Sequence, residues 1–245
     1  MKLSVLQWNV WFKEKADNVV RFVRETDADI VCLQELTRDS ADNPGRDIVA
    51  EIEALGYHSA YEATLIRYGT GTITMGDGIF SKFPLTDKRH VYVQREDPSS
   101  HHYSKENRLY VEATLSVGNS TLTVGTVHLS YVSEFFVDAE KKKEVDKLLA
   151  AVRGNTERFI LSGDLNSNPD TYTIERLEKI LKPAGPDYAQ ATWTTKPFSY
   201  DGFEASTLDW RLDYVFTTPD VKVLESKIIQ TDVSDHLPIL ATIEI

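Results

Sequence analysis

Short apolar runs alternate with amphipathic stretches along the chain. Between residues 15 and 25, Val19, Val20, Phe22 and Val23 fall on one face, which is typical of a helix packed against a sheet. The same pattern predicts helices at residues 15–25, 47–55, 137–152 and 171–181. It predicts strands at residues 3–10, 29–34, 109–117, 121–129, 158–166, 212–217, 221–230 and 238–245.

The domain organisation follows from length and from what interrupts the pattern. The 245 residues contain no linker, low-complexity segment or short-period repeat. A chain of this length buries about 70% of its unfolded surface, which is enough for a core of its own. We therefore expect one domain spanning residues 1–245, of the α/β (α+β) class.

Polar side chains mark the points where several predicted strands end. Asn9, Glu35 and His128 each close an apolar run, and Asp164 and Asn166 close another. The period of two along a strand places Asp164 and Asn166 on one face. Carboxylate and amide oxygens suit a hard divalent cation such as Mg²⁺ or Mn²⁺. Taken singly, each of these residues is also what a solvated turn would contain.

Two later segments add an imidazole with acids beside it. Asp213 interrupts an apolar strand, and Asp235 directly precedes His236 at the entry to the last strand. An imidazole that is held by a carboxylate can activate water, and a second carboxylate can hold a metal ion. For His236 alone, the alternative is a capped histidine on the surface.

These segments resemble the endonuclease/exonuclease/phosphatase superfamily, which has the deoxyribonuclease I-like fold. The matching segments occur in the family's order and span nearly the whole chain. They are Gln7-Trp8-Asn9-Val10, Leu33-Gln34-Glu35, residues 78–85, Thr126-Val127-His128-Leu129, Gly163-Asp164-Leu165-Asn166, residues 211–216 and Ser234-Asp235-His236-Leu237-Pro238. The resemblance implies a two-sheet α/β sandwich with helices on its outer faces and a metal site at one edge of the sheets.

The resemblance also implies a ligand set for the metal ion. Glu35 would be the principal Mg²⁺ ligand, helped by Asn9 and Asp235. Asp164 and Asn166 would position the attacking water and the phosphoryl oxygens.

The histidines have roles implied in the same way. Asp213 would orient His236, which would act as general base or as a positively charged clamp, and His128 would stabilise the phosphoryl charge or assist the leaving group. Whether Asp164 or the His236–Asp213 pair takes the proton of water stays open. Metal and imidazoles together supply what phosphodiester hydrolysis needs, namely charge neutralisation and an in-line water.

Net charge narrows the class of partner. Lys and Arg number 27 against 38 Asp and Glu, a net charge of −11. This excess of acid argues against a protein that merely coats nucleic acid, whose affinity comes from a basic surface. It is compatible with an enzyme whose acids gather around a divalent ion that meets the phosphates.

Residues 81–110 carry a net positive charge, unlike the rest of the chain. They hold six basic residues, including Arg108, against four acidic ones, together with His90, His101, His102 and Tyr103. They would steer a polyanion to the metal, with Arg108 contacting a phosphate, or would form a solvated loop of mixed charge. In contrast, Lys141-Lys142-Lys143 lies among acids and is expected to be a solvated helix face.

The segment 193–210 is rich in aromatic residues. It carries Trp193, Phe198, Tyr200, Phe203 and Trp210. Such a segment stacks on bases, contacts a lipid interface, or simply covers a core. We take Trp193 as the candidate for substrate contact.

The expected function is hydrolysis of a phosphodiester in nucleic acid, by an endonuclease or exonuclease. The segment 210–214 resembles the apurinic-endonuclease and exonuclease III branch. The alternative is a phosphatase or a phospholipase C-type enzyme acting on small or lipid phosphoesters. A binding module without catalysis would be expected to lack at least one metal or imidazole position, whereas all of them are present.

The single cysteine and the N-terminal residues bear on the cellular compartment in which the protein is expected to work. Cys32, the single cysteine, lies in the apolar run Ile30-Val31-Cys32-Leu33 and is expected to be a buried thiol. The first residues are too polar for a secretory signal, and no apolar run is long enough to span a bilayer. We expect a cytoplasmic monomer without stable membrane insertion.

Overall fold

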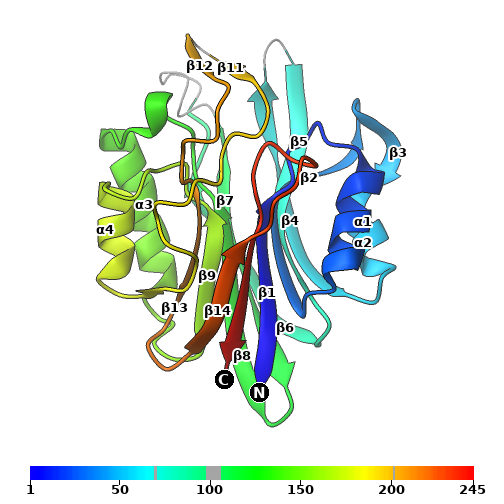
Figure 1. The fold of residues 1–245 in the computed structure, drawn as a ribbon, viewed down its shortest axis with the longest axis vertical. Helices are drawn as coiled ribbons and strands as arrows, with labels where there is room; N and C mark the ends of the chain where they lie inside the picture. Colours follow the sequence, from blue (N-terminus) through cyan, green and yellow to red (C-terminus); the bar gives the residue numbers. More distant parts are fainter. Residues whose placement is uncertain (69–70, 98–105, 201) are drawn as a thin grey trace.

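Two β-sheets pack face to face, with helices on both outer surfaces (Figure 1). The computed structural model describes residues 1–68, 71–97, 106–200 and 202–245. The helices are α1 (Ala16–Thr26), α2 (Ile48–Glu53), α3 (Ala139–Val152) and α4 (Tyr172–Glu178), with a 3-10 turn η2 (Ser133–Phe135). The expected α/β sandwich is confirmed.

The first sheet has the strand order β14-β15-β1-β2-β5-β4, with β3 paired to β2. The second has the order β10-β13-β9-β8-β7-β6, and β11 and β12 form a separate two-stranded sheet. The strands are β1 (Lys2–Asn9), β2 (Ile30–Ser40), β3 (Asn43–Asp47), β4 (His58–Tyr68), β5 (Gly71–Ser81), β6 (Leu85–Gln94), β7 (Arg108–Val117), β8 (Ser120–His128), β9 (Phe159–Asp164), β10 (Lys182–Pro183), β11 (Phe198–Tyr200), β12 (Phe203–Ala205), β13 (Asp213–Thr217), β14 (Lys222–Ile228) and β15 (Ile239–Glu244).

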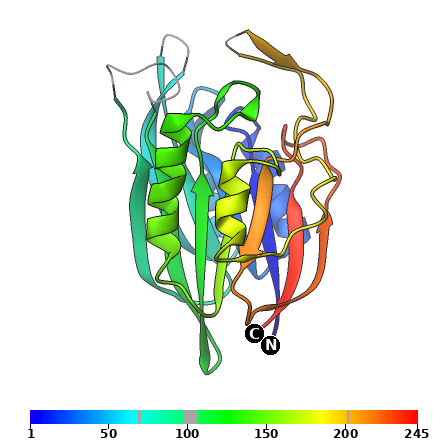
Figure 2. The same ribbon diagram turned by 90° about the vertical axis from the view of Figure 1, so that its left-hand side faces the viewer.

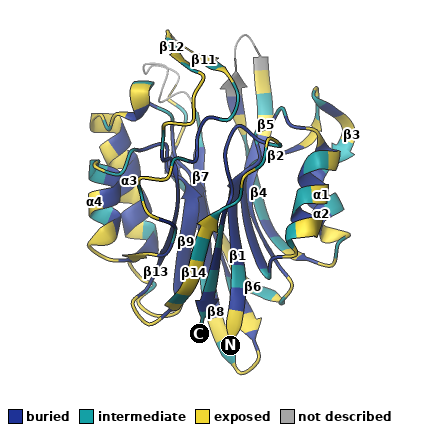
Figure 3. Cartoon of the chain, viewed as in Figure 1, coloured by how far each residue is buried: buried dark blue, intermediate teal, exposed yellow. Residues whose placement is uncertain are grey.

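Three layers of apolar side chains hold the sandwich together. Val5 and Ile79 of the first sheet meet Val124 and Ile160 of the second in the central layer. The other two layers lie between a sheet and its helices, with α1 and α2 on the first sheet and α3 and α4 on the second. Figure 2 shows α3 and α4 side by side on the second sheet, and Figure 3 shows the buried strands between the helix layers.

Every helix and strand predicted from the apolar pattern is present, with ends shifted by a few residues. The largest difference is β2, which was expected to end at residue 34 and continues to Ser40. Helix starts follow local chemistry, because Asp47 caps α2 by accepting from Ala50 N at 3.0 Å and Asp138 caps α3 by accepting from Lys141 N at 2.8 Å.

Cys32 lies in the central layer, with no exposed surface. Burial raises the pKa of its thiol to about 12, so the thiolate that reacts is disfavoured. Among the described helices, none is long and apolar enough to cross a membrane.

Lys141 corrects the expectation of a solvated basic face on α3. Lys142 and Lys143 are exposed as expected, but Lys141 is only 1% exposed. Its Nζ donates to Ser130 O and lies 3.6 Å from Glu144 Oε2, while Glu144 accepts from Ser130 N at 3.0 Å. Positions three apart share one face of a helix, so Lys141 and Glu144 both turn toward the sheet and bind the loop after β8.

Replacing Lys141 with methionine is expected to lower the free energy of unfolding by about 3–5 kcal/mol, because the carboxylate of Glu144 is left buried without its cation. Urea denaturation followed by circular dichroism measures this. Lys142→Met on the exposed face is the matched control and should change stability by under about 0.5 kcal/mol. Equal stability of the two variants would contradict the pairing.

Candidate active site

The chain bends at Glu35 because β2 contains a bulge. In the pairing of β2 with β5, Leu33 lies opposite Gly78 and Leu36 opposite Gly76, so two residues of β2 face one of β5. Glu35 has a φ of 62°, a left-handed conformation that turns its side chain out of the strand's alternation. Its Oε2 accepts from Phe12 N at 3.0 Å and its Oε1 from Asn9 Nδ2 at 3.1 Å.

Asp164 lies at the end of β9, beside His128 at the end of the parallel strand β8. Its Oδ2 accepts from Asn9 Nδ2 at 3.0 Å, and its Oδ1 accepts from Asn166 N at 2.9 Å. Burial raises the pKa of Asp164 to about 6 despite these hydrogen bonds. Asn9 therefore links the carboxylates of Glu35 and Asp164, which come from different sheets.

His236 and Asp213 form a buried pair. His236 Nδ1 lies 2.8 Å from Asp213 Oδ2, and its Nε2 lies 3.6 Å from Asp164 Oδ2. Burial disfavours the charged imidazole, but the carboxylates of Asp213, Asp164 and Asp235 outweigh burial and raise the pKa of His236 well above its ordinary value. Asp213 thereby orients the ring with one nitrogen facing the pocket.

The surroundings of His128 shift its pKa in the opposite direction to that of His236. Burial and the nearby guanidinium of Arg108 hold the pKa of His128 well below its ordinary value. Arg108 Nη1 lies 3.1 Å from His128 Nδ1, and Asn166 Nδ2 lies 3.1 Å from His128 Nε2, so each ring nitrogen has a neighbouring N–H donor. That Nε2 lies 3.4 Å from Asp164 Oδ2 and 3.9 Å from Glu35 Oε1.

Arg108, expected to contact a phosphate, does line the pocket. It is nearly fully buried and binds Glu106 as well as His128. The other basic residues that the structure describes in the segment 81–110 do not line the pocket. Lys82 pairs with Asp27 at 2.7 Å and Arg89 with Glu112 at 2.5 Å. The expected His101, His102, Tyr103 and Lys105 lie outside the described residues.

Trp193 and Asp235 lie next to each other in the lining of the pocket. Trp193 is buried, and its Nε1 donates to Asp235 Oδ2 at 3.2 Å. Burial raises the pKa of Asp235 to about 6. The indole packs on Phe135 and Phe198, with centroids 5.1 and 5.0 Å away, so the aromatic segment both covers a small core and borders the pocket.

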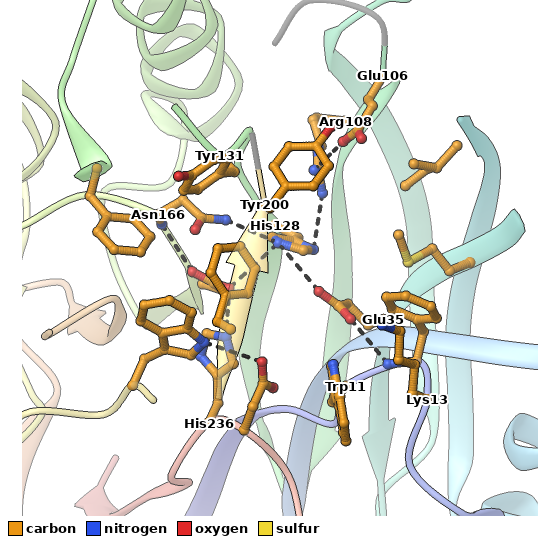
Figure 4. Close-up of a pocket in the computed structure, with 18 of the residues that line it drawn as sticks. Trp11, Lys13, Glu35, Glu106, Arg108, His128, Tyr131, Asn166, Tyr200 and His236 are labelled. Carbon is orange, nitrogen blue, oxygen red and sulfur yellow. Dashed lines mark hydrogen bonds and ion pairs between the residues drawn. The ribbon is translucent and has the colours of Figure 1, made fainter. Parts of the chain in front are cut away.

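A cavity of about 190 Å³ joins these groups (Figure 4). Carboxylates and imidazoles from both sheets lie at its centre, with Trp11 and Lys13 on one side and Tyr131 and Asn166 on the other. Our reading of the sequence missed its apolar lining: Trp11, Phe12, Ile66, Met75, Tyr131 and Phe135. The only signal was position, since Trp11-Phe12 and Tyr131 follow closely on Asn9 and His128.

The residues present fit a divalent cation. Glu35 and Asp235 both line the cavity and offer hard oxygen donors. Asp164, Asp213 and His236 also place ligand atoms within 4.8 Å of one another. In that group, however, Asp213 and His236 already bind each other, and Asp213 does not line the cavity. Glu35, Asp164 and Asp235 are carboxylates that do line the cavity.

Asn9 is placed differently from the other expected ligands. Its Oδ1 accepts from Trp11 N at 3.0 Å, and its Nδ2 faces the carboxylates of Glu35 and Asp164. In this arrangement it orients carboxylates rather than offering an oxygen to the cavity.

Solved structures with the same fold come from several organisms. An endonuclease/exonuclease/phosphatase from Beutenbergia cavernae DSM 12333 superposes with a TM-score of 0.81 at 21% identity, covering 100% of this chain and 72% of that one. The human Nocturnin catalytic domain with bound sulfate has a TM-score of 0.71 at 16% identity, covering 99% and 94%. ANGEL2, described as a 2',3'-cyclic phosphatase in complex with adenosine-2',3'-vanadate, has a TM-score of 0.70 at 17% identity, covering 99% and 95%.

These structural likenesses establish the fold, and the family follows from the sequence itself. No curated protein sequence matches the chain. The model of the Endonuclease/Exonuclease/phosphatase family matches residues 6–236. This chain belongs to the endonuclease/exonuclease/phosphatase family, whose members hydrolyse phosphoester bonds.

Proposed function

We propose that this protein is a Mg²⁺- or Mn²⁺-dependent phosphodiesterase that acts on nucleic acid. The observation that carries this proposal is the convergence of Glu35, His128, Asp164, Asp235 and His236 on one cavity at the strand ends of both sheets. Two imidazoles with opposite pKa shifts beside buried carboxylates are what a site for proton transfer and charge stabilisation requires.

Glu35 and Asp235 would hold the metal ion, oriented by Asn9 and by Trp193 Nε1. A bound divalent ion neutralises phosphoryl charge and favours attack by water. Burial disfavours the charged form of both carboxylates. A cation bound beside them would offset the free-energy cost of burying these negative charges.

Asp164 lies between the two imidazoles and would accept the proton of the attacking water. Asn166 would hold a phosphoryl oxygen beside it. His236, aligned by Asp213, would serve as the positive clamp on the developing charge. His128, which Arg108 and Asn166 hold in place and whose lowered pKa keeps it neutral, would stabilise the charge that builds on the phosphoryl or leaving oxygen without giving up a proton.

Cleavage assays test this function directly. Purified protein with Mg²⁺ or Mn²⁺ is expected to cleave at least one of three substrates, a single-stranded oligonucleotide, an abasic duplex or a plasmid. EDTA should stop the reaction, and the Glu35→Ala variant should be inactive. If wild type cleaves none of these above the Glu35→Ala background, nucleic acid is not the substrate.

A phosphatase or phospholipase C-type activity on small or lipid phosphoesters is the second candidate. The apolar walls of the cavity and the partly exposed ring of Tyr200 favour it. ANGEL2, described as a 2',3'-cyclic phosphatase, has the same fold. Release of inorganic phosphate or phosphocholine from a panel of soluble substrates and vesicles, without cleavage of nucleic acid, would identify it.

A further inference from the structure

A group of buried polar side chains lies beneath the floor of the cavity, between the two sheets. On β1, Val5 belongs to the central apolar layer, and Gln7 follows two positions later on the same face of the strand. The inner faces of β2, β8 and β13 contribute three more polar side chains near the site, namely Gln34, Thr126 and Asp213. All four are fully buried. Buried polar groups need hydrogen-bond partners, so these side chains have to bind one another or their neighbours.

The two glutamines bind each other head to tail. Gln7 Nε2 donates to Gln34 Oε1 at 2.5 Å, and Gln34 Nε2 donates to Gln7 Oε1 at 3.1 Å. Gln34 Nε2 also donates to Thr126 Oγ1 at 2.8 Å. The glutamines come from β1 and β2 of the first sheet and the threonine from β8 of the second (Figure 1). The amide pair therefore links the two sheets and is anchored at one end by Thr126.

The other end of this network reaches the carboxylate of Asp213. Gln7 Nε2 donates to Asp213 Oδ1 at 3.4 Å, while Asp213 Oδ2 lies 2.8 Å from His236 Nδ1. The contact from Gln7 is long, but a hydrogen bond to a charged group in a dry interior is stronger than one between neutral groups. An ionised carboxylate can only accept, so Gln7 directs its NH₂ group toward Asp213 and its oxygen toward Gln34. The orientation of both amides is thereby fixed.

We propose that Gln7 and Gln34 are positioning residues. They act through Asp213 to hold the ring of His236 in the orientation that the reaction needs. A carboxylate held at one oxygen only can rotate about its Cβ–Cγ bond and carry the imidazole with it. The hydrogen bond from Gln7 holds the second oxygen of Asp213, and Gln34 keeps the amide of Gln7 turned toward it. This inference rests on the proposed role of His236 in the same cavity.

Nuclear magnetic resonance of the Gln7→Met variant tests this positioning without turnover. Methionine is unbranched like glutamine and lacks the amide. The proton on His236 Nδ1 is protected from exchange with water as long as Asp213 holds the ring, and the spectrum of His236→Ala assigns its resonance. The resonance is expected in wild type and should be lost or broadened in Gln7→Met. Ser162→Ala, at a buried position on β9 between the same two sheets, is the matched control and should retain it.

Steady-state kinetics on the best substrate gives a second measurement. Gln7→Met is expected to lower kcat by about 10–100-fold with less than about a threefold change in KM, because a small misplacement of a reacting group mainly slows the chemical step. The double variant Gln7→Met/Gln34→Met removes both amides together. It should therefore recover part of the urea midpoint that the single variant loses, while kcat stays low. A purely structural role of the amides would instead restore kcat along with stability.

An unchanged His236 resonance in Gln7→Met, a kcat within about twofold of wild type, or recovery of kcat in the double variant would each overturn the inference. If Gln7→Met does not fold, the double variant provides both measurements. Failure of the proposed function looks different, because wild type would then hydrolyse no nucleic acid while the His236 resonance would still depend on Gln7.

Discussion

His236→Ala is expected to lower kcat by about 10²–10⁴-fold, with a much smaller change in KM. The imidazole is held at 2.8 Å by Asp213 and lies 3.6 Å from Asp164, at the centre of the cavity. In the proposed reaction it interacts with charge that develops only in the transition state. Its loss should therefore affect the chemical step more than substrate binding. Steady-state kinetics on the best substrate with saturating metal measures the effect.

A double-mutant cycle with Asp213 shows whether the pair acts as one unit. Asp213→Asn should lower kcat substantially, because an amide neither stabilises the imidazolium nor keeps the ring in the same tautomer. The double variant should be no slower than His236→Ala alone. His90→Ala, an exposed histidine beside Glu62 and outside the cavity, is the matched control. Additive losses would mean that Asp213 acts independently of His236.

Glu35→Gln is expected to raise the Mg²⁺ concentration for half-maximal activity by roughly 100-fold, since one negative ligand is lost while length and shape are kept. The amide oxygen can still accept from Phe12 N, while the hydrogen bond from Asn9 Nδ2 is lost because the amide nitrogen is a donor. Mg²⁺ binding by calorimetry gives the same quantity without turnover.

Glu134→Gln, an exposed acid in the η2 turn outside the cavity lining, is the control for the loss of one charge. It should leave Mg²⁺ affinity within about twofold of wild type. Unchanged Mg²⁺ affinity in Glu35→Gln would remove Glu35 from the ligand set and favour Asp235 and Asp164.

Much of the fold can be predicted from the sequence, because the apolar runs along the chain have to be buried in the core. The meeting of Asn9 with Glu35, and of His128 with Asp164, follows from two pairs of parallel strands that end at the same edge. The family resemblance also predicts Asp213 beside His236, and the two side chains lie 2.8 Å apart.

Other features depend on tertiary contacts that no local pattern contains. The burial of Lys141 depends on the path of the loop after β8, because Ser130 provides the oxygen that binds its ammonium group. The pairing of Arg108 with His128 needs two neighbouring strands in register. The apolar walls come from segments as distant as Trp11 and Tyr200, and each segment alone resembles ordinary core.

The bulge at Glu35 has a consequence for how this position can vary. A left-handed backbone is tolerated by glycine, asparagine and aspartate but is costly for β-branched residues. Glycine has no carboxylate, asparagine has no charge, and aspartate is one methylene too short to reach both Phe12 N and Asn9 from the same backbone. The backbone thus excludes β-branched residues, and the ligand chemistry excludes the residues that the backbone tolerates best. At limiting Mg²⁺, a library randomised at this codon should return almost no active member besides wild type.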